Sequence, residues 1–121
     1  MAGPIVQNFS IPADDDVELD FTLVPTGQII LGPGSEIFFD AYESQFGAPI
    51  PGVDPVIVKV LDHGIEITDP DLLTFTVTIL RADTAGLLRN YYYEVRIVDA
   101  AGLSITTTIG ILTVTGTEIR V

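Results

Sequence analysis

Carboxylates are the side chains in this sequence with the clearest capacity for chemistry, and they gather near the N-terminus and in turn-like segments. The first group comprises Asp14, Asp15, Asp16, Glu18 and Asp20, and the second comprises Asp62, Asp69, Asp71, Asp83 and Asp99. Because oxygen ligands of this kind bind Ca²⁺, a calcium site is one hypothesis. The first group lacks the spaced ligands and the glycine of a calcium-binding loop, which favours a solvated acidic edge that hinders strand-to-strand aggregation. We therefore expect no metal and no cofactor.

The other residue types that catalysis needs are scarce. The chain has one histidine, four serines and no cysteine from which to assemble a general base, a nucleophile or a metal centre. His63 stands beside Gly64 and is interpreted as an exposed turn residue, since a zinc site would need further His or Cys ligands. The sequence therefore argues against an enzyme.

The charge balance excludes nucleic acid as a partner. There are 17 acidic residues against 5 basic ones, which gives a formal net charge of −12. Binding to a phosphate backbone depends on clustered cations. The basic residues are single and scattered, at Lys59, Arg81, Arg89, Arg96 and Arg120. We interpret the acidity as a source of solubility that suppresses self-association, with a basic partner surface as the alternative.

The length and the hydropathy indicate one folded domain. A chain of 121 residues with 47% hydrophobic residues and a mean hydropathy of +0.46 can bury a single core. We expect that domain to span 1–121, with short arms at 1–11 and 115–121. Apolar runs such as 28–31 are too short to cross a bilayer, and the start of the chain lacks the pattern of a signal peptide. These features predict synthesis in the cytoplasm and no membrane partner.

Alternating apolar residues indicate the β-strands that must position the carboxylates and other polar side chains. In 90–98 the odd-numbered residues are apolar or aromatic, whereas the even-numbered ones include charged groups. Segments 17–23 and 73–80 alternate in the same way, and a period of two is typical of half-buried β-strands. The predicted core therefore contains Leu19, Phe21, Phe75, Val77, Ile79, Tyr91, Tyr93 and Val95.

Shorter signals describe the rest of the chain. Further strands are expected at 5–11, 28–31, 36–42, 56–61, 65–68 and 103–114. Gly110 is interpreted as a bulge or bend in the last of these, and Gly64 as the positive-φ residue of a hairpin-like turn. A helical turn capped by the Asp83 carboxylate is expected to lead into Tyr91, as at the tyrosine corner of immunoglobulin-like domains. The pattern predicts an all-β, immunoglobulin-like Greek-key β-sandwich of about eight strands.

A proline-rich loop and the two chain ends are the candidates for a binding surface. Segment 43–55 carries Phe46, Ile50 and Val53 among prolines and glycines, and a rigid loop with apolar groups suits a protein partner. Apolar residues also stand near both ends, at Ile5, Val6, Ile119 and Val121. Because an apolar terminus can add a strand to a neighbour's open sheet edge, we predict that the loop and one or both ends contact partners.

Several motifs together resemble small virion proteins of tailed phages. They are residues 15–21, 64–67, 83–84 with Leu87, 90–95, 99–102 and 110–114. The chain is similar over nearly its whole length to the N-terminal immunoglobulin-like domain of siphophage baseplate upper proteins. The resemblance implies a non-enzymatic virion component, synthesised in the host cytoplasm, without catalytic residues. Its partners are then other capsid or tail proteins of the virion, or copies of itself.

Baseplate upper proteins continue into further domains, whereas this sequence ends at Val121. That difference favours a stand-alone accessory protein that decorates a capsid or completes the head or tail. Two alternatives remain open: attachment to a tail or baseplate, and a carbohydrate- or receptor-binding sandwich module in which Tyr92 stacks on a sugar.

Overall fold

The computed structural model describes residues 5–13, 15–22, 34–45, 48–49, 52–69, 74–84, 87, 90–99 and 102–115. These residues form ten β-strands and one short helix. The elements are β1 (Ile5–Val6), β2 (Phe9–Pro12), β3 (Val17–Thr22), β4 (Glu36–Gln45), β5 (Ala48–Pro49), β6 (Ile57–Leu61), β7 (Gly64–Asp69), β8 (Thr74–Ile79), α1 (Arg81–Thr84), β9 (Asn90–Val98) and β10 (Ser104–Thr115). The strand expected at 28–31 lies outside the described residues. No helix in the described ranges is long and apolar enough to span a membrane.

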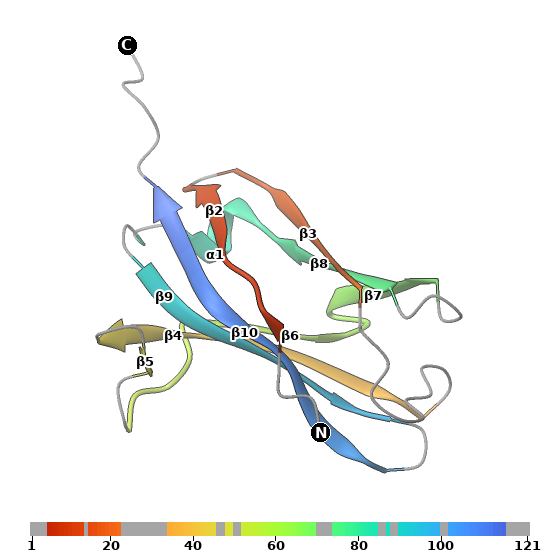
Figure 1. Ribbon diagram of the computed structural model, residues 1–121. Coiled ribbons are helices and arrows are strands. Elements are labelled where there is room, and N and C mark those ends of the chain that lie inside the picture. Colours follow the sequence, from red (N-terminus) through yellow and green to blue (C-terminus); the bar gives the residue numbers. More distant parts are fainter. Residues whose placement is uncertain are drawn as a thin grey trace.

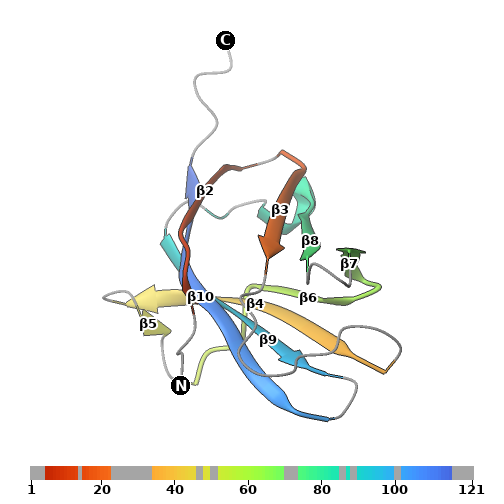
Figure 2. The same cartoon turned by 45° about the vertical axis from the view of Figure 1, so that its right-hand side comes forward.

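The strands pair in the order β1-β10-β9-β4-β6-β7-β8-β3, with β2 also on β10 and β5 on the end of β4. Figures 1 and 2 show that this path folds into two layers, one of β10, β9, β4 and β6, the other of β7, β8 and β3. The first two strands run parallel to β10, at the edge of the first layer. The architecture is the predicted immunoglobulin-like β-sandwich.

The turn that joins β6 to β7 differs from the predicted hairpin. Gly64 has a positive φ of 105°, as expected, but Asp62 also has a positive φ, of 71°. β6 and β7 pair in parallel over only two residue pairs, Val60 with Gly64 and Leu61 with Ile65, so the chain does not reverse direction here as it would in a hairpin. The turn therefore carries the chain from one layer to the other instead of back along the same sheet (Figure 1).

The alternation predicted for the core is confirmed. Every residue of the predicted core is buried: Leu19, Phe21, Phe75, Val77, Ile79, Tyr91, Tyr93 and Val95. On β3 the intervening residues Glu18 and Asp20 are exposed, which gives that strand one solvent-exposed face and one buried face.

Aromatic rings from five strands fill the centre of the sandwich. Phe21 of β3 lies 5.3 Å from Phe75 of β8, and Phe39 of β4 lies 5.2 Å from Tyr93 of β9, measured between ring centroids. Phe21 also contacts Tyr93 at 6.2 Å and Phe9 of β2 at 5.4 Å, so the cluster joins the two layers. Because each buried ring contributes about 1.5–3 kcal/mol, this cluster is a major source of stability.

The helical turn before β9 begins earlier than predicted. The helix α1 starts at Arg81, so Asp83 lies inside it rather than at its N-cap. The Asp83 carboxylate reaches back and accepts a hydrogen bond from the Leu80 backbone N–H at 2.7 Å, as in a capping box. The same carboxylate forms an ion pair at 2.6 Å with Lys59, which connects α1 to β6. Leu87 packs against the core, as expected for the end of this turn.

The segment expected as a first strand or arm docks on its own sheet, and this contact explains Gly110. The irregularity in β10 lies between Thr106 and Thr108, so the interpretation of Gly110 as a bulge is wrong. A Cβ atom at position 110 would instead overlap the backbone carbonyl of Gln7. Only glycine therefore lets the first segment approach β10 so closely.

Candidate functional site

The apolar residues predicted to bind partners fall on separate elements. Ile5 and Val6 form β1, and both are exposed, Val6 to 67%. That strand pairs with the chain's own β10, at Thr108 and Ile109. Val53 is exposed too and lies in the loop before β6. The other predicted contact residues lie outside the described residues: Phe46, Ile50, Ile119 and Val121.

Two of the acidic residues named from the sequence hold neighbouring elements together, namely Asp16 just before β3 and Asp20 within β3. Asp16 accepts a hydrogen bond from the Arg81 backbone N–H at 2.8 Å, and Asp20 accepts one from the Thr76 hydroxyl at 2.7 Å. Within the described ranges, no three His, Cys, Asp or Glu side chains come together in a way that could hold a metal ion. Two of the acidic residues named from the sequence, Asp14 and Asp71, are not among those described.

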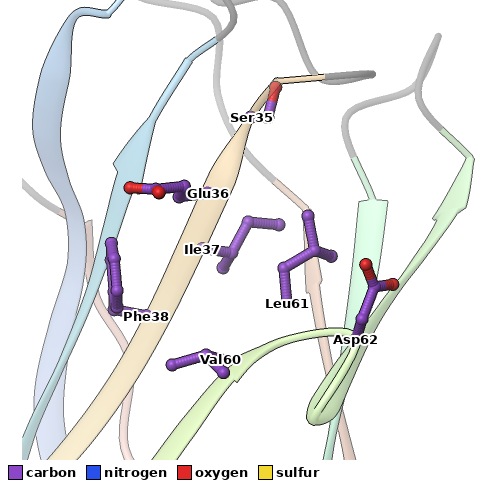
Figure 3. Close-up of a pocket in the computed structure, with 7 residues that line it drawn as sticks. All are labelled: Ser35, Glu36, Ile37, Phe38, Val60, Leu61 and Asp62. Atoms are coloured by element: carbon purple, nitrogen blue, oxygen red, sulfur yellow. The ribbon is translucent and has the colours of Figure 1, made fainter.

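Two hollows lie beside the β6–β7 turn. The larger, of about 300 Å³, is lined by residues 35–38 and 60–62 (Figure 3). The smaller, of about 270 Å³, is lined by Asp62, residues 64–66 and Thr78. Their linings combine carboxylates with apolar side chains and include no histidine. His63 itself is exposed in the turn, as predicted. A broader surface adjoins the larger hollow and shares Glu36, Phe38 and Val60 with it.

That surface is the outward side of the layer formed by β10, β9, β4 and β6. Figure 3 shows Glu36 and Phe38 on one side of β4 and Ile37 on the other, so even-numbered residues of β4 point away from the core. The strand register aligns the outward residues in four rows: Ser104–Val98–Glu36, Thr106–Arg96–Phe38–Val60, Ile109–Glu94–Asp40–Val58 and Ile111–Tyr92–Tyr42. We call these residues the outer face.

Most of the outer face is aromatic or aliphatic. Tyr42 and Tyr92 stand directly opposite each other, and Ile111 continues their row. In a neighbouring row, the Arg96 guanidinium carbon lies 4.8 Å from the centroid of the Phe38 ring, a cation–π contact. Tyr, Phe and Arg are enriched at protein interfaces. The face therefore carries three residue types that protein interfaces favour.

An acidic pair interrupts the apolar rows. Asp40 and Glu94 are direct cross-strand neighbours, in the row that Ile109 and Val58 complete. Burial raises the pKa of Asp40, against the opposing effect of the Arg96 charge. The pKa of Tyr92 is also raised, by burial first and then by the charge of Glu94 and a hydrogen bond to it. The middle of the face thus combines two neighbouring carboxylates with the positive charge of Arg96.

Comparison with known proteins identifies similar folds. No family model matches the chain, and no curated protein matches it. Among solved structures, the ZIG-8–RIG-5 IG1–IG1 heterodimer is similar at 12% sequence identity and a TM-score of 0.44, over 94% of this chain and 86% of the other. The extracellular domain of the voltage-gated sodium channel β4 subunit, described as a parallel homodimer in cell–cell adhesion, is similar at 14% identity and a TM-score of 0.41, over 97% of each chain. At these identities the likeness concerns the fold alone.

Sequence reasoning named Tyr92 as a possible sugar-stacking residue but did not identify the rest of the outer face as a binding surface. The sequence did contain an indication of this face, because aromatic residues occur at both even and odd positions of 36–45 and of 90–98. Alternation predicts that a strand has two faces, but it does not say whether a second layer covers both of them. The layer arrangement settles this point, since the described elements of the other layer pack only on the odd-numbered side of β4 and β9.

Proposed function

We propose that this protein is a non-enzymatic structural protein of a tailed-phage virion, an accessory module that docks on a larger assembly in capsid decoration or in head or tail completion. The phage assignment rests on the sequence motifs that resemble virion proteins. The docking role rests on the outer face. The proposed location is the mature virion, and the proposed partners are other capsid or tail proteins.

The observation that carries the docking role is the concentration of Tyr42, Tyr92, Phe38 and Ile111 on one side of a sheet whose core lies on the opposite side. Folding does not require these side chains to be apolar, because the buried residues between them already supply the core. Four strands about 4.8 Å apart, and seven residues of β4 with a rise of about 3.3 Å each, make this face about 20 by 23 Å. Contiguous apolar surface that the core does not cover commonly marks an interaction site on a soluble domain.

The test is incorporation into phage particles. A phage that lacks the gene is complemented with wild-type protein or with the double variant Tyr92→Ser, Ile111→Ser, and purified virions are analysed by mass spectrometry. We expect the variant to fold but to be lost from particles, since the change removes apolar contact area from the centre of an interface. The matched control is Thr22→Ala with Thr78→Ala, on the other layer, which should be incorporated like wild type. If purified virions lack even the wild-type protein, the proposal is wrong.

A second experiment tests the loop and the chain ends. The variant Phe46→Ser, Ile50→Ser and a deletion of residues 116–121 probe the contacts predicted from the sequence. The deletion begins after Thr115 because the backbone carbonyl of that residue accepts a hydrogen bond from Ala13 at 2.9 Å. Both variants should melt like wild type and be incorporated poorly. Normal incorporation of both would restrict docking to the outer face.

The Tyr42–Tyr92 pair also favours a second candidate, a carbohydrate- or receptor-binding module at the tail or baseplate. Aromatic rings on a flat surface can stack on sugar rings. A glycan array with wild type and the Tyr92→Ser variant checks this candidate. The sugar-binding candidate requires that wild type bind a glycan on the array and that the Tyr92→Ser variant lose this binding.

A further inference from the structure

The centre of the outer face carries two carboxylates on neighbouring strands. Like charges directly opposite each other destabilise a sheet, and Asp40 and Glu94 are such a pair. Both side chains are half-buried, and aliphatic side chains flank them at Ile109 and Val58. Among the described residues, neither carboxylate forms an ion pair. Strand alternation would allow a neutral residue at either position, so the fold itself gives no reason for the pair.

We propose that the outer face binds a protein surface in which Arg or Lys side chains stand among apolar groups, and that Asp40 and Glu94 accept those cations. This inference rests on the proposed function, because it names the partner chemistry of the same docking face. The apolar rows then supply contact area, and the acidic pair selects the partner.

The charges on the face favour a basic partner over a second copy of this chain. Besides the pair, the face carries one cation, Arg96, which lies over Phe38, and one further carboxylate, Glu36. A second copy would bring the same carboxylates toward each other, and each copy has a net charge of −12. Docking also removes water from Asp40 and Glu94, which is favourable only when cations replace that water. A partner surface with Arg or Lys at its centre avoids the repulsion between carboxylates and supplies the cations that replace the water.

The experiment uses a charge-reversed copy of the full chain, Asp40→Lys with Glu94→Lys, as the probe. This copy presents the same apolar rows around a basic centre, and flat sheet faces can pack on one another in aligned fashion. Wild type and probe are each expected to be monomeric in analytical ultracentrifugation, and their mixture is expected to form a one-to-one complex. Raising the ionic strength from about 0.05 M to about 0.5 M should weaken that complex.

Two matched variants separate the acidic pair from general charge attraction. A copy with Glu18→Lys and Asp20→Lys carries the same charge change on β3, and wild type should bind it at least about tenfold more weakly than it binds the probe. The isosteric variant Asp40→Asn, Glu94→Gln keeps the shape of the face and should bind the probe at least about tenfold more weakly than wild type does. Should the double-lysine probe fail to fold, Asp40→Lys alone replaces it.

Equal binding of wild type to the probe and to the β3 variant would overturn the proposal, and so would undiminished binding by the isosteric variant. Homodimers of wild type through this face would also overturn it. These results do not depend on phage particles. Absence of the protein from virions would refute the proposed function alone, and a failed mixing experiment would refute the partner chemistry alone.

Discussion

The hydroxyl of Tyr93 connects the aromatic core to the first segment of the chain. The ring stacks on Phe39 at 5.2 Å, and the hydroxyl donates a hydrogen bond to the backbone carbonyl of Gln7 at 2.5 Å. Burial raises the pKa of Tyr93, so the hydroxyl stays protonated and can remain a donor. One side chain therefore serves both the core and the docking of residues 5–12.

Replacing Tyr93 with Phe tests that connection. The ring and its packing are kept, while the carbonyl of Gln7 loses its donor. We expect the free energy of unfolding to fall by about 0.5–1.5 kcal/mol, measured by urea denaturation. Tyr92→Phe on the outer face is the control and should change stability less. An equal loss of unfolding free energy in both variants would show that the hydrogen bond to Gln7 does not stabilise the domain specifically.

Replacing Asp40 with Asn should stabilise the free protein at neutral pH. Because folding raises the pKa of Asp40 above its ordinary value of 3.8, the native state binds that proton more tightly than the unfolded chain does. The contribution of Asp40 to stability is therefore complete below pH 3.8 and is lost as the pH rises through the raised pKa. At pH 7 burial desolvates the charged carboxylate, which also faces Glu94, and the attraction to Arg96 offsets this only in part, so the variant should gain about 0.2–1 kcal/mol.

The measurement for Asp40→Asn is thermal melting at pH 7 and at pH 3. The difference from wild type should be positive at pH 7 and should shrink toward zero at pH 3. Glu66→Gln, on β7, removes a carboxylate outside the outer face and serves as the control. A wild type that is more stable than the Asp40 variant at pH 7 would contradict the unfavourable acidic pair.

At the scale of elements, the contact between the first segment and β10 depends on backbone as much as on side chains. The Gln7 N–H donates to the Ile109 carbonyl at 2.9 Å, and the Asn8 side chain accepts from the Ile111 N–H at 2.9 Å. Together with the parallel pairing of β1 and β2, these bonds protect the edge of the first layer that β10 would otherwise expose. The close approach at Gly110 makes this pairing possible.

Gly110→Ala should detach residues 5–13 from β10 without unfolding the β-sandwich. The added methyl group would occupy the space of the Gln7 carbonyl, so residues 5–13 should lose protection in hydrogen exchange, while β9 and β4 keep theirs. Gly102→Ala is the comparison, because no atom lies within 4 Å of that Cβ and only its φ of 91° is strained. It should cost about 1–2 kcal/mol without local loss of protection at residues 5–13.

At the scale of the whole molecule, the sandwich is held together by packing between its layers. The chain has no cysteine, so no disulfide crosses the core. Phe21 of β3 contacts Phe39 and Tyr93 of the other layer at 6.4 and 6.2 Å, and Phe75 of its own layer at 5.3 Å. A residue in this position couples the stability of both sheets.

Phe21→Ala should therefore destabilise the whole domain. Loss of a fully buried ring costs about 3–5 kcal/mol, a large part of the 5–15 kcal/mol available to a typical domain. Chemical denaturation followed by circular dichroism measures the change, with Val6→Ala on the exposed first strand as the control. A loss below about 1 kcal/mol would mean that the two layers are not coupled through this ring.

Metal is not expected to contribute to stability. Several carboxylates are already engaged in hydrogen bonds to the protein, among them Asp16, Asp83 and Asp99. Thermal melts with EDTA and with millimolar calcium should nearly coincide, since a ligand stabilises only a state that it binds. A rise of many degrees with calcium would reveal a site.

The sequence by itself determined which side of β3, β8 and β9 faces inward. Alternation is a local property, and it was sufficient to place Phe21, Phe75 and Tyr93 in the core and to expose Glu18 and Asp20. The absence of cysteine and the single histidine were equally readable without a structure.

Only the tertiary structure decided which strands are neighbours and which sheet faces lie away from the core. Asp40 and Glu94 are far apart in the sequence, and only the register of β4 against β9 places them side by side. The role of Gly110 likewise depends on a segment about a hundred residues away, at Gln7. Local propensity carries no information about such pairings, because they arise from the way the two layers and the first segment pack together.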